Sequence, residues 1–298
     1  MSKERIGFAG LGLMGHGMAS NILKKGFPLA VLAHRNRTNV DDLIGRGATE
    51  AASPRQLAEM SDIVVLCVTG SAQVEELVQG EYGLAAAGKK LVIVDCSTSD
   101  PSSTVRLAAD LARKGIVLID APLSRTPKDA AEGTLDVMVG GAADIVERVR
   151  PVLDAFSQKV THTGPTGSGH TMKLLNNFIS LGYGAIYAEA LALGAKAGLT
   201  PTVIDKVIRG GRMDCGFYQT FFKYVLERDR DAHKFALRNA LKDLSYLSAF
   251  ANASETANPI GASVRNSYAL AVGMGRGDDY IPMLSDIIGE VNGVKPAD

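Results

Sequence analysis

Short apolar runs alternate with stretches of helical periodicity along the first half of the chain. The apolar runs are Ile6–Ala9, Pro28–Ala33, Ile63–Val68, Leu91–Asp95 and Ile116–Asp120. Helical spacing appears between them, at Leu13–Lys25 and after the Ser53-Pro54 and Asp100-Pro101 pairs, where a capping residue precedes a proline. Several runs are almost unbroken, as in strands covered on both faces. The alternation predicts an α/β fold with right-handed crossovers and a doubly wound parallel sheet.

The pattern changes near Gly164. Before it, strand candidates at Thr134–Val139 and Lys159–Thr163 flank a predicted helix at Ala142–Phe156 and extend the sheet. After it, strand signals fade and long amphipathic stretches follow, at Ser168–Ala197, Pro201–Arg209, Ala232–Asn252 and Pro259–Gly273. We therefore expect two domains, a sheet domain over residues 1–164 and an all-α domain over residues 165–298 that begins with a long interdomain helix.

Charge and cysteine usage narrow the class of protein. Lys plus Arg and Asp plus Glu both total 32 in 298 residues, so the formal net charge is zero. This balance argues against nucleic-acid binding and against docking to an anionic membrane surface. Cys67, Cys96 and Cys215 are far apart and predict neither a disulfide framework nor a metal site. With no signal peptide and no apolar run of roughly 20 residues, we expect a cytoplasmic protein.

A glycine-rich turn follows the first predicted strand and opens the first helix. It reads Gly10-Leu11-Gly12-Leu13-Met14-Gly15 and matches G-x-G-x-x-G. In this context the first glycine permits the tight turn, the second lets the backbone approach a pyrophosphate, and the third allows close helix–strand packing. The free N–H groups at the helix start then hold the phosphates. The turn predicts a dinucleotide site in the first domain, although a plain strand–helix junction is the alternative.

The end of the second predicted strand indicates which dinucleotide. An acidic residue about 20 positions after the turn holds the ribose of NAD, but this chain reads Ala33-His34-Arg35-Asn36-Arg37-Thr38, with no carboxylate before Asp41. Arginines suit the 2′-phosphate of NADP through their charge and forked donors. We therefore expect NADP to be preferred over NAD, with His34, Arg35 and Asn36 near the ribose. A solvated basic loop is the alternative.

Four polar residues share one face of the long helix predicted from Ser168. Lys173, Asn176, Asn177 and Ser180 are spaced i, i+3, i+4 and i+7, and Leu, Phe and Ile cover the rest. Such a stripe is costly if it is buried without partners and sensible if it lines a cleft. A lysine at a cleft can act as a general acid–base. A solvent-facing stripe at a domain boundary is the alternative.

Together these motifs resemble the β-hydroxyacid dehydrogenase family, which includes 3-hydroxyisobutyrate dehydrogenase, tartronate semialdehyde reductase and 6-phosphogluconate dehydrogenase. The resemblance covers nearly the whole chain. It rests on Gly7–Gly15, Met18–Asn21, Asp95–Thr98, Asp120–Ser124, Gly133–Leu135, Met138–Gly141, Gly167–Gly169 with Lys173 and Asn177, and Lys242–Leu244.

The resemblance implies roles for individual residues. Lys173 would be the catalytic acid–base and Asn177 its partner, while Ser124 would bind the acid group of the substrate. Lys242 would close over cofactor and substrate. Residues Val68, Thr69 and Thr98 would lie near the nicotinamide. The implied reaction is reversible hydride transfer between a small β-hydroxy acid and its semialdehyde or keto form, with no metal required.

One departure concerns the substrate. Most of the family reads Ser-Gly-Gly where this chain has Ser124-Arg125-Thr126. An arginine and a hydroxyl suit a bulkier or more highly charged oxyanion. This resembles the sulfolactaldehyde reductase branch, in which the corresponding Arg125, Thr126, Asn176 and Ser180 would hold a sulfonate. That branch has glycine in place of Ser124 and an aspartate suited to NAD. The alternative for Arg125 is an ion pair with Asp129 or Glu132.

Two other functions remain open at this stage. An imine reductase shares the architecture but usually replaces the catalytic lysine, and a non-catalytic dinucleotide sensor or scaffold has no need of Lys173, Asn177 and Lys242 together. Gly182 and Gly184 on the long helix permit close approach of another helix. We therefore expect a homodimer or homotetramer, with a small anionic hydroxy acid or aldehyde as the substrate.

Overall fold

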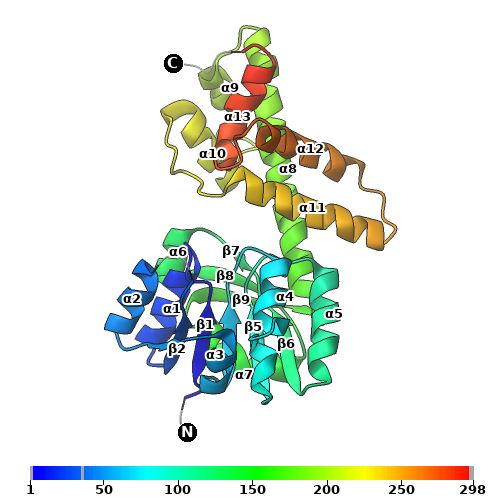
Figure 1. Ribbon diagram of the computed structural model, residues 1–298. Coiled ribbons are helices and arrows are strands. Elements are labelled where there is room, and N and C mark those ends of the chain that lie inside the picture. Colours follow the sequence, from blue (N-terminus) through cyan, green and yellow to red (C-terminus); the bar gives the residue numbers. More distant parts are fainter. Residues whose placement is uncertain (1–2, 35–36, 295–298) are drawn as a thin grey trace. The chain divides into compact units, whose positions relative to one another are not determined.

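A computed structural model describes residues 3–34 and 37–294 of the chain, which form two compact units, Met1–Lys173 and Leu174–Asp298. The first unit is a mixed α/β unit and the second is helical (Figure 1). This confirms the predicted fold class. The units part inside one helix, nine residues after the boundary expected at residue 164, and the functional division of the domains stays a prediction.

The first unit alternates strands and helices in the predicted way. Its elements are β1 (Ile6–Ala9), α1 (Gly15–Lys24), β2 (Leu29–Leu32), α2 (Thr38–Gly45), β3 (Thr49–Ala51), α3 (Pro54–Met60), β4 (Ile63–Leu66), α4 (Ser71–Gln79), the 3-10 helix η1 (Leu84–Ala87), β5 (Leu91–Asp95), α5 (Pro101–Ala112), β6 (Ile116–Asp120), β7 (Leu123–Ser124), α6 (Pro127–Glu132), β8 (Leu135–Gly140), α7 (Ala143–Leu153) and β9 (Ser157–Gly164). The sequence pattern misses short elements such as α2, β3, α6 and β7, because each offers too few residues to display a period.

The sheet has the strand order β3-β2-β1-β4-β5-β6-β8-β7, with β9 paired to β8. The first six strands of this order are parallel. Strand β8 then runs antiparallel to both β6 and β7, which differs from the all-parallel sheet expected. The strand ends are level, since Ala9 pairs with Leu66, Leu66 with Asp95, and Asp95 with Asp120. The loops after these strands therefore leave the sheet at one edge.

Alternate strand residues pack against helices on opposite faces of the sheet. Ile63 and Val65 of β4 belong to a core completed by α1, α2, α6 and α7, whereas Val64 and Leu66 belong to a core completed by α3, α4 and α5. All four side chains are fully buried. Burial on both faces explains why the strands read as continuous apolar runs in the sequence.

The second unit packs helices around a long one. Its elements are α8 (Ser168–Lys196, which starts in the first unit), α9 (Pro201–Ile208), α10 (Gly216–Glu227), α11 (Leu237–Ala253), α12 (Pro259–Gly273), the 3-10 helix η2 (Ile281–Met283) and α13 (Leu284–Val291). Helices α10 and α13 were not predicted. Helix α11 starts at Leu237 instead of Ala232, because Ala236 forms an isolated β-bridge with Tyr280 and the amide of Leu237 donates to Asp279 O at 2.8 Å.

Gly184 of α8 allows close packing within the second unit. A Cβ at Gly184 would lie 2.9 Å from the hydroxyl of Tyr268 on α12, and that hydroxyl donates to Leu181 O at 3.0 Å. A Cβ at Gly182 would be 3.9 Å from Val264. Gly184 is therefore already approached by a helix of the same chain, and the expected oligomer stays a prediction.

Candidate functional site

The glycine-rich turn joins β1 to α1 in a conformation that needs glycine. Gly10 has a φ of 98°, and a Cβ there would lie 2.2 Å from Cys67 O. A Cβ at Gly15 would lie 1.9 Å from Gly10 O. Gly12, by contrast, is exposed and has nothing within 4 Å of its Cβ position. The outer glycines thus hold the turn closed, while the middle one presents bare backbone to a ligand.

The start of α1 fits a dinucleotide phosphate. No side chain caps the helix at Met14, so its first N–H groups lack the side-chain acceptor that usually satisfies them. Leu13 is 70% exposed, and Asn39 Nδ2 donates to Leu11 O at 2.7 Å, which fixes the turn from α2. N–H groups at a helix start without a side-chain cap, beside an unhindered glycine, can hold a pyrophosphate. Residues 10–15 therefore fit the cofactor that the sequence predicts.

The loops after β4 and β5 lie beside this turn at the same edge of the sheet. Ser97 connects them, because its hydroxyl accepts a hydrogen bond from the amide of Val68 at 3.0 Å. Thr69 is exposed and Thr98 is half-buried. Burial raises the pKa of the Cys67 thiol in this region to about 12, so it stays protonated near neutral pH. The predicted nicotinamide-side residues Val68, Thr69 and Thr98 thus share one edge with the glycine turn.

The basic loop after β2 is described in part. His34 is exposed, whereas Arg35 and Asn36 lie outside the described residues. Arg37 is engaged by two carboxylates: its guanidinium bonds both oxygens of Glu50 at 2.9 Å and Asp41 at 3.0 Å. These bonds raise the pKa of Arg37. Of the two arginines that favour NADP, Arg37 is therefore held by the protein itself.

The segment that departs from the family pattern lies between β7 and α6. Ser124 ends β7 and is half-buried. Arg125 is exposed, and its Nε donates to Asp136 at 2.8 Å while its Nη1 lies 3.7 Å from Asp129. Thr126 caps α6, accepting the Asp129 amide and donating to the Asp129 carboxylate. The ion pair of Arg125 with Asp129, given above as the alternative interpretation, is present. A shorter ion pair joins Arg125 to Asp136.

Helix α8 carries the polar stripe predicted for it. Lys173 is half-buried near the start of the helix, Asn176 and Ser180 are half-buried, and Asn177 is buried. Ser180 Oγ donates back to Asn177 O at 3.2 Å. Since Lys173 and Asn177 are four residues apart on one continuous helix, they share a face.

In the second unit a buried carboxylate contacts two predicted site residues, Asn177 and Lys242. Asp243 on α11 is 3% exposed and accepts a 2.7 Å hydrogen bond from Asn177 Nδ2. The Lys242 ammonium lies 3.1 Å from the other oxygen of Asp243 and 5.3 Å from the centre of the Tyr246 ring. In the sequence, Asp243 stands out only as part of the Lys242–Leu244 motif. Its spacing beside Lys242 was the available signal, but its burial could not be read from the sequence.

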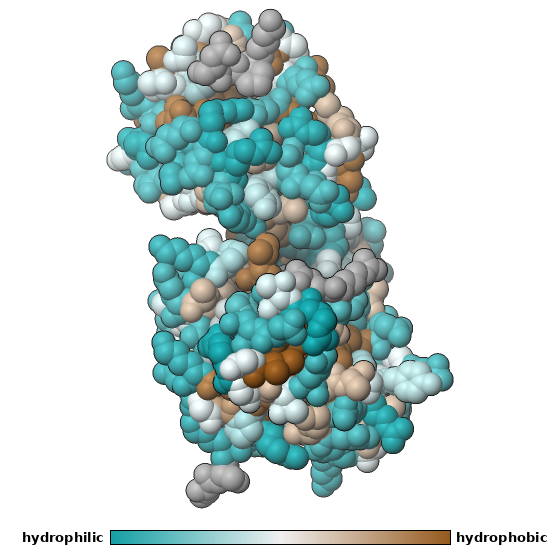
Figure 2. All heavy atoms as spheres, turned by 60° about the vertical axis from the view of Figure 1, so that its left-hand side comes forward, coloured by the Kyte–Doolittle hydropathy of each residue, from teal (hydrophilic) through white to brown (hydrophobic). Residues whose placement is uncertain are grey.

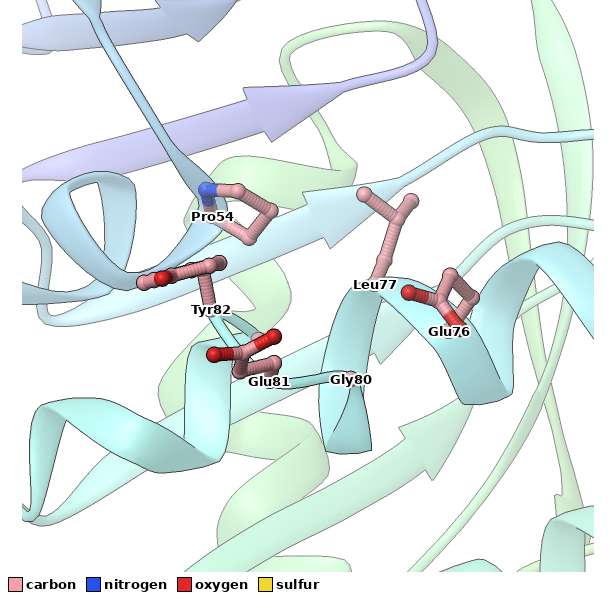
Figure 3. Close-up of a pocket in the computed structure, with 7 residues that line it drawn as sticks. Pro54, Glu76, Leu77, Gly80, Glu81 and Tyr82 are labelled. Carbon is pink, nitrogen blue, oxygen red and sulfur yellow. The ribbon is translucent and has the colours of Figure 1, made fainter.

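Other features of the described residues lie apart from these groups. A surface hollow is lined by Pro54, Glu76, Leu77, Gly80, Glu81, Tyr82 and Gly83, none of which is a predicted site residue (Figure 3). Within residues 3–34 and 37–294, no group of three or more His, Cys, Asp and Glu side chains could hold a metal ion. The visible surface is mostly hydrophilic, with hydrophobic atoms in small separate areas (Figure 2).

Helix α8 is long and apolar enough to cross a membrane by length and composition. The expectation that no such run exists is therefore wrong by this measure. Core helices of globular proteins meet the same criterion, and Leu174, Leu181 and Ala188 of α8 are packed in the core of the second unit. A single helix of this kind is weak support for a membrane protein.

Both parts of the chain are similar to domains of known proteins. Residues 5–164 match the NAD binding domain of 6-phosphogluconate dehydrogenase, and residues 167–285 match the domain described as NAD-binding of NADP-dependent 3-hydroxyisobutyrate dehydrogenase. The 3-sulfolactaldehyde reductase of Escherichia coli is 34% identical over 284 residues, 95% of each chain. The 3-hydroxyisobutyrate dehydrogenase of Pseudomonas aeruginosa is 37% identical over 273 residues, covering 89% of this chain and 91% of its own.

A solved structure agrees with these relatives. The 3-hydroxyisobutyrate dehydrogenase from Salmonella typhimurium superposes with a TM-score of 0.84 at 28% identity, covering 96% of this chain and all of its own. The matched stretches contain the glycine turn of the first unit as well as the Lys173–Asn177 stripe and Lys242. The chain therefore belongs to the β-hydroxyacid dehydrogenase family and is an NAD(P)-dependent oxidoreductase.

Proposed function

We propose that this enzyme interconverts a small anionic β-hydroxy acid and its semialdehyde or keto form, with Lys173 as the acid–base. The observation that carries the proposal is the stripe on α8, where a half-buried Lys173 is followed one turn later by a buried Asn177 that Asp243 holds in place. An amide fixed in this way is poorly explained as a solvent-facing surface group.

Each group has a distinct task in this scheme. When bound along the glycine turn, the nicotinamide dinucleotide accepts or supplies the hydride. The ammonium of Lys173 gives a proton to the carbonyl oxygen during reduction, and the neutral amine takes it back from the hydroxyl during oxidation. Asn177 has one N–H committed to Asp243, which leaves its amide oxygen and second N–H to orient the substrate oxygen.

For the substrate head group we propose a strongly anionic acid, with a sulfonate as the leading candidate. Arg125 supplies a charged fork, and its guanidinium keeps further N–H groups beyond those facing Asp136 and Asp129. Ser124, Thr126, Asn176 and Ser180 would add neutral donors, and Lys242 a second charge. The similarity to a protein named 3-sulfolactaldehyde reductase supports this choice.

For the cofactor we propose NADP in preference to NAD. The loop after β2 has no carboxylate before Asp41, and Asp41 itself is bonded to Arg37. With Arg37 engaged by Glu50, the preference rests on Arg35, aided by His34 and Asn36. Arg35→Ala should lower kcat/KM with NADPH at least tenfold and leave kcat/KM with NADH within about twofold. Equal efficiency of the unaltered enzyme with both dinucleotides would contradict the preference.

We also propose a homodimer or homotetramer in the cytoplasm. Helix α8 exposes large apolar side chains along the second unit, namely Leu175, Ile179, Tyr183, Ile186 and Leu193. An exposed apolar stripe of this length suits a subunit interface. The three free thiols fit a reducing compartment. Sedimentation equilibrium of the purified enzyme, with Ile179→Glu and Ile186→Glu as disrupting changes, tests the assembly.

A substrate panel tests the main proposal. Semialdehydes with carboxylate, sulfonate and phosphate heads, together with a cyclic imine, are assayed with NADPH and NADH. Lys173→Ala should lower turnover of the best aldehyde by about 10²- to 10⁴-fold while dinucleotide affinity survives. Lys196→Ala, which changes an exposed lysine at the other end of the same helix, is the matched control. Turnover within tenfold of the unaltered enzyme for Lys173→Ala, or reduction of the imine alone, would overturn the proposal.

A further inference from the structure

The first turn of α8 is capped from within the sheet by a residue that the mechanism does not use. Asp120, the last residue of β6, is fully buried. One of its carboxylate oxygens accepts the amide of Gly167 at 2.6 Å, and the other accepts the amide of His170 at 2.7 Å. A carboxylate that bonds N–H groups before and inside the first helical turn satisfies donors that have no partner in the helix.

The local sequence is shaped to admit this carboxylate. A Cβ at Gly140 on β8 would lie 2.7 Å from one Asp120 oxygen, and a Cβ at Gly169 would lie 2.9 Å from the other and 2.5 Å from Met138 O. Both glycines therefore let β6, β8 and the start of α8 approach closely around one side chain. The cap is a built feature of the fold.

His170 fixes the same turn from a second direction. Its ring is fully buried, with Nε2 donating to Ser97 O at 3.2 Å and Nδ1 lying 2.8 Å from Thr104 Oγ1 on α5. Two buried carboxylates face this ring, Asp95 at 3.7 Å from Nε2 and Asp120 at 3.9 Å from Nδ1. The ring thus links α8 to the loop after β5 and to α5.

These contacts restrict both how α8 is rotated about its axis and how far it slides along it. The hydrogen bonds to Asp120 fix the position of the first turn along the helix axis, and the contacts of the His170 ring fix its rotation about that axis. Lys173 follows His170 by three residues, so its Cα lies close to the same helical face. A rotation of the first turn would move the Lys173 ammonium sideways, whereas nothing in the glycine turn would change.

We propose that Asp120 and His170 are positioning residues for Lys173. They hold its ammonium within hydrogen-bond distance of the place where the substrate oxygen binds. The inference rests on the proposed acid–base role of Lys173. In this proposal a buried His–Asp cluster that does not touch the reacting groups keeps Lys173 in the position that proton transfer requires. Small misplacements of a catalytic group lower the rate by large factors. The alternative is a cluster that only stabilises the fold.

The steady-state test compares variants at one position. His170→Ala should lower kcat at least tenfold and move the kcat–pH profile, with KM for the dinucleotide within about threefold. His170→Gln, whose amide can still reach Ser97 O, should recover most of the lost kcat. His162→Ala is the matched control, because that exposed histidine of β9 bonds the carbonyls of Gly141 and Gly164. Its kcat should stay within about twofold of the unaltered enzyme.

Three outcomes of this experiment would overturn the inference. They are an unchanged kcat in His170→Ala, an unmoved pH profile despite a lower kcat, and a loss in His170→Gln as large as that in His170→Ala. The last two would indicate that the cluster acts through stability alone.

A second measurement needs no substrate and so separates this inference from the proposed function. In Asp120→Asn one oxygen becomes an N–H donor facing a backbone N–H. Hydrogen exchange at the amides of Gly167 and His170 should then accelerate at least tenfold, while exchange in α1 is unchanged. Unaltered protection of the first turn would contradict the positioning role. If the unaltered enzyme reduces no aldehyde in the panel, the proposed function fails whatever this exchange experiment shows.

Discussion

The guanidinium of Arg125 donates to Asp136 at 2.8 Å from a backbone that L-residues rarely adopt. Arg125 has a φ of 87°, in the left-handed region that favours glycine. Most of the resembling family carries glycine there, so the arginine costs strain that a glycine would not. Backbone strain of this kind clusters at functional sites, and Arg125 is one of the residues predicted to bind the substrate.

This relationship predicts that a glycine at position 125 is better tolerated than an alanine. Both Arg125→Gly and Arg125→Ala remove the exposed ion pairs with Asp129 and Asp136, so their loss is common to the two variants. Only alanine keeps a Cβ on the left-handed backbone. Arg125→Gly should therefore unfold in urea with a free energy about 0.5–1 kcal/mol above that of Arg125→Ala. Equal stability of the two variants would show that the backbone relaxes.

The same arginine should determine the affinity for the substrate anion. Loss of a charge-assisted contact in Arg125→Ala should raise KM for the preferred anionic aldehyde roughly tenfold or more, with KM for the dinucleotide unchanged. Lys128→Ala, which removes an exposed neighbouring lysine of α6, should leave both KM values within about twofold. A uniform loss of kcat at constant KM would argue against this role.

The two ends of the glycine turn should respond differently to a methyl group. In Gly15→Ala the new Cβ meets Gly10 O at 1.9 Å, so we expect the free energy of unfolding to fall by about 1–3 kcal/mol or more. In Gly12→Ala nothing lies within 4 Å, so stability should hold while dinucleotide Kd rises at least tenfold. Thermal unfolding and titration calorimetry measure the two effects. Unchanged affinity in Gly12→Ala would move the cofactor away from this turn.

The carboxylate of Asp243 should be needed for both stability and turnover. Asp243→Asn places an N–H group against either Asn177 Nδ2 or the Lys242 ammonium, whichever way the amide is turned. We expect the free energy of unfolding to fall by about 1–3 kcal/mol and kcat to fall with it. Asp231→Asn, which changes an exposed ion pair with Lys234 in the same unit, should change the free energy of unfolding much less. Full activity of Asp243→Asn would count against Asn177 as an orienting group.

The Arg5–Asp62 pair gives a pH dependence with a definite sign. The hydrogen bond from Arg5 lowers the pKa of Asp62 to about 2, below the value of about 3.9 in an unfolded chain. The unfolded state therefore binds more protons between these values, so the stabilisation is complete above about pH 4 and is lost as the pH falls toward about 2. Because both side chains are partly exposed, its size is below about 1 kcal/mol.

Urea unfolding of the unaltered protein and of Asp62→Asn measures this dependence. The stability difference should be larger at about pH 6 than at about pH 3. In an Arg5→Met background it should shrink without vanishing, because the backbone amide of residue 5 still donates to Asp62 at 3.0 Å. A difference that grows on acidification would reverse the sign and contradict the assignment.

Much of the first unit could be predicted because its strands are buried on both faces. Strands β4 and β5 are continuous apolar runs in the sequence. The capping pairs Ser53-Pro54 and Asp100-Pro101 predict the starts of helices α3 and α5. The short elements β3 and β7 were missed because neither is long enough to show a period. The antiparallel direction of β8 depends on how this strand pairs with β6 in the folded sheet, which no local pattern reports.

The candidate site divides in the same way. The glycine turn and the Lys173–Asn177 stripe follow from spacing, because a 3.6-residue period places side chains on a face without any tertiary contact. The partners of these groups do not follow from spacing. Asp243 reaches Asn177 across 66 positions, and Asp120 reaches His170 across 50. No local pattern connects such distant residues.

By itself, the sequence determined the fold class, the glycine-rich turn and the polar stripe of α8, since each shows as a pattern of residues close together in the chain. Only the tertiary structure decided that Arg125 is held by Asp136, that Gly184 receives Tyr268, and that buried carboxylates hold α8. The physical reason is that the two partners of each contact belong to different elements of the chain, so only folding brings them together. At the buried carboxylates a donor is also required, because an unpaired charge inside a protein is costly.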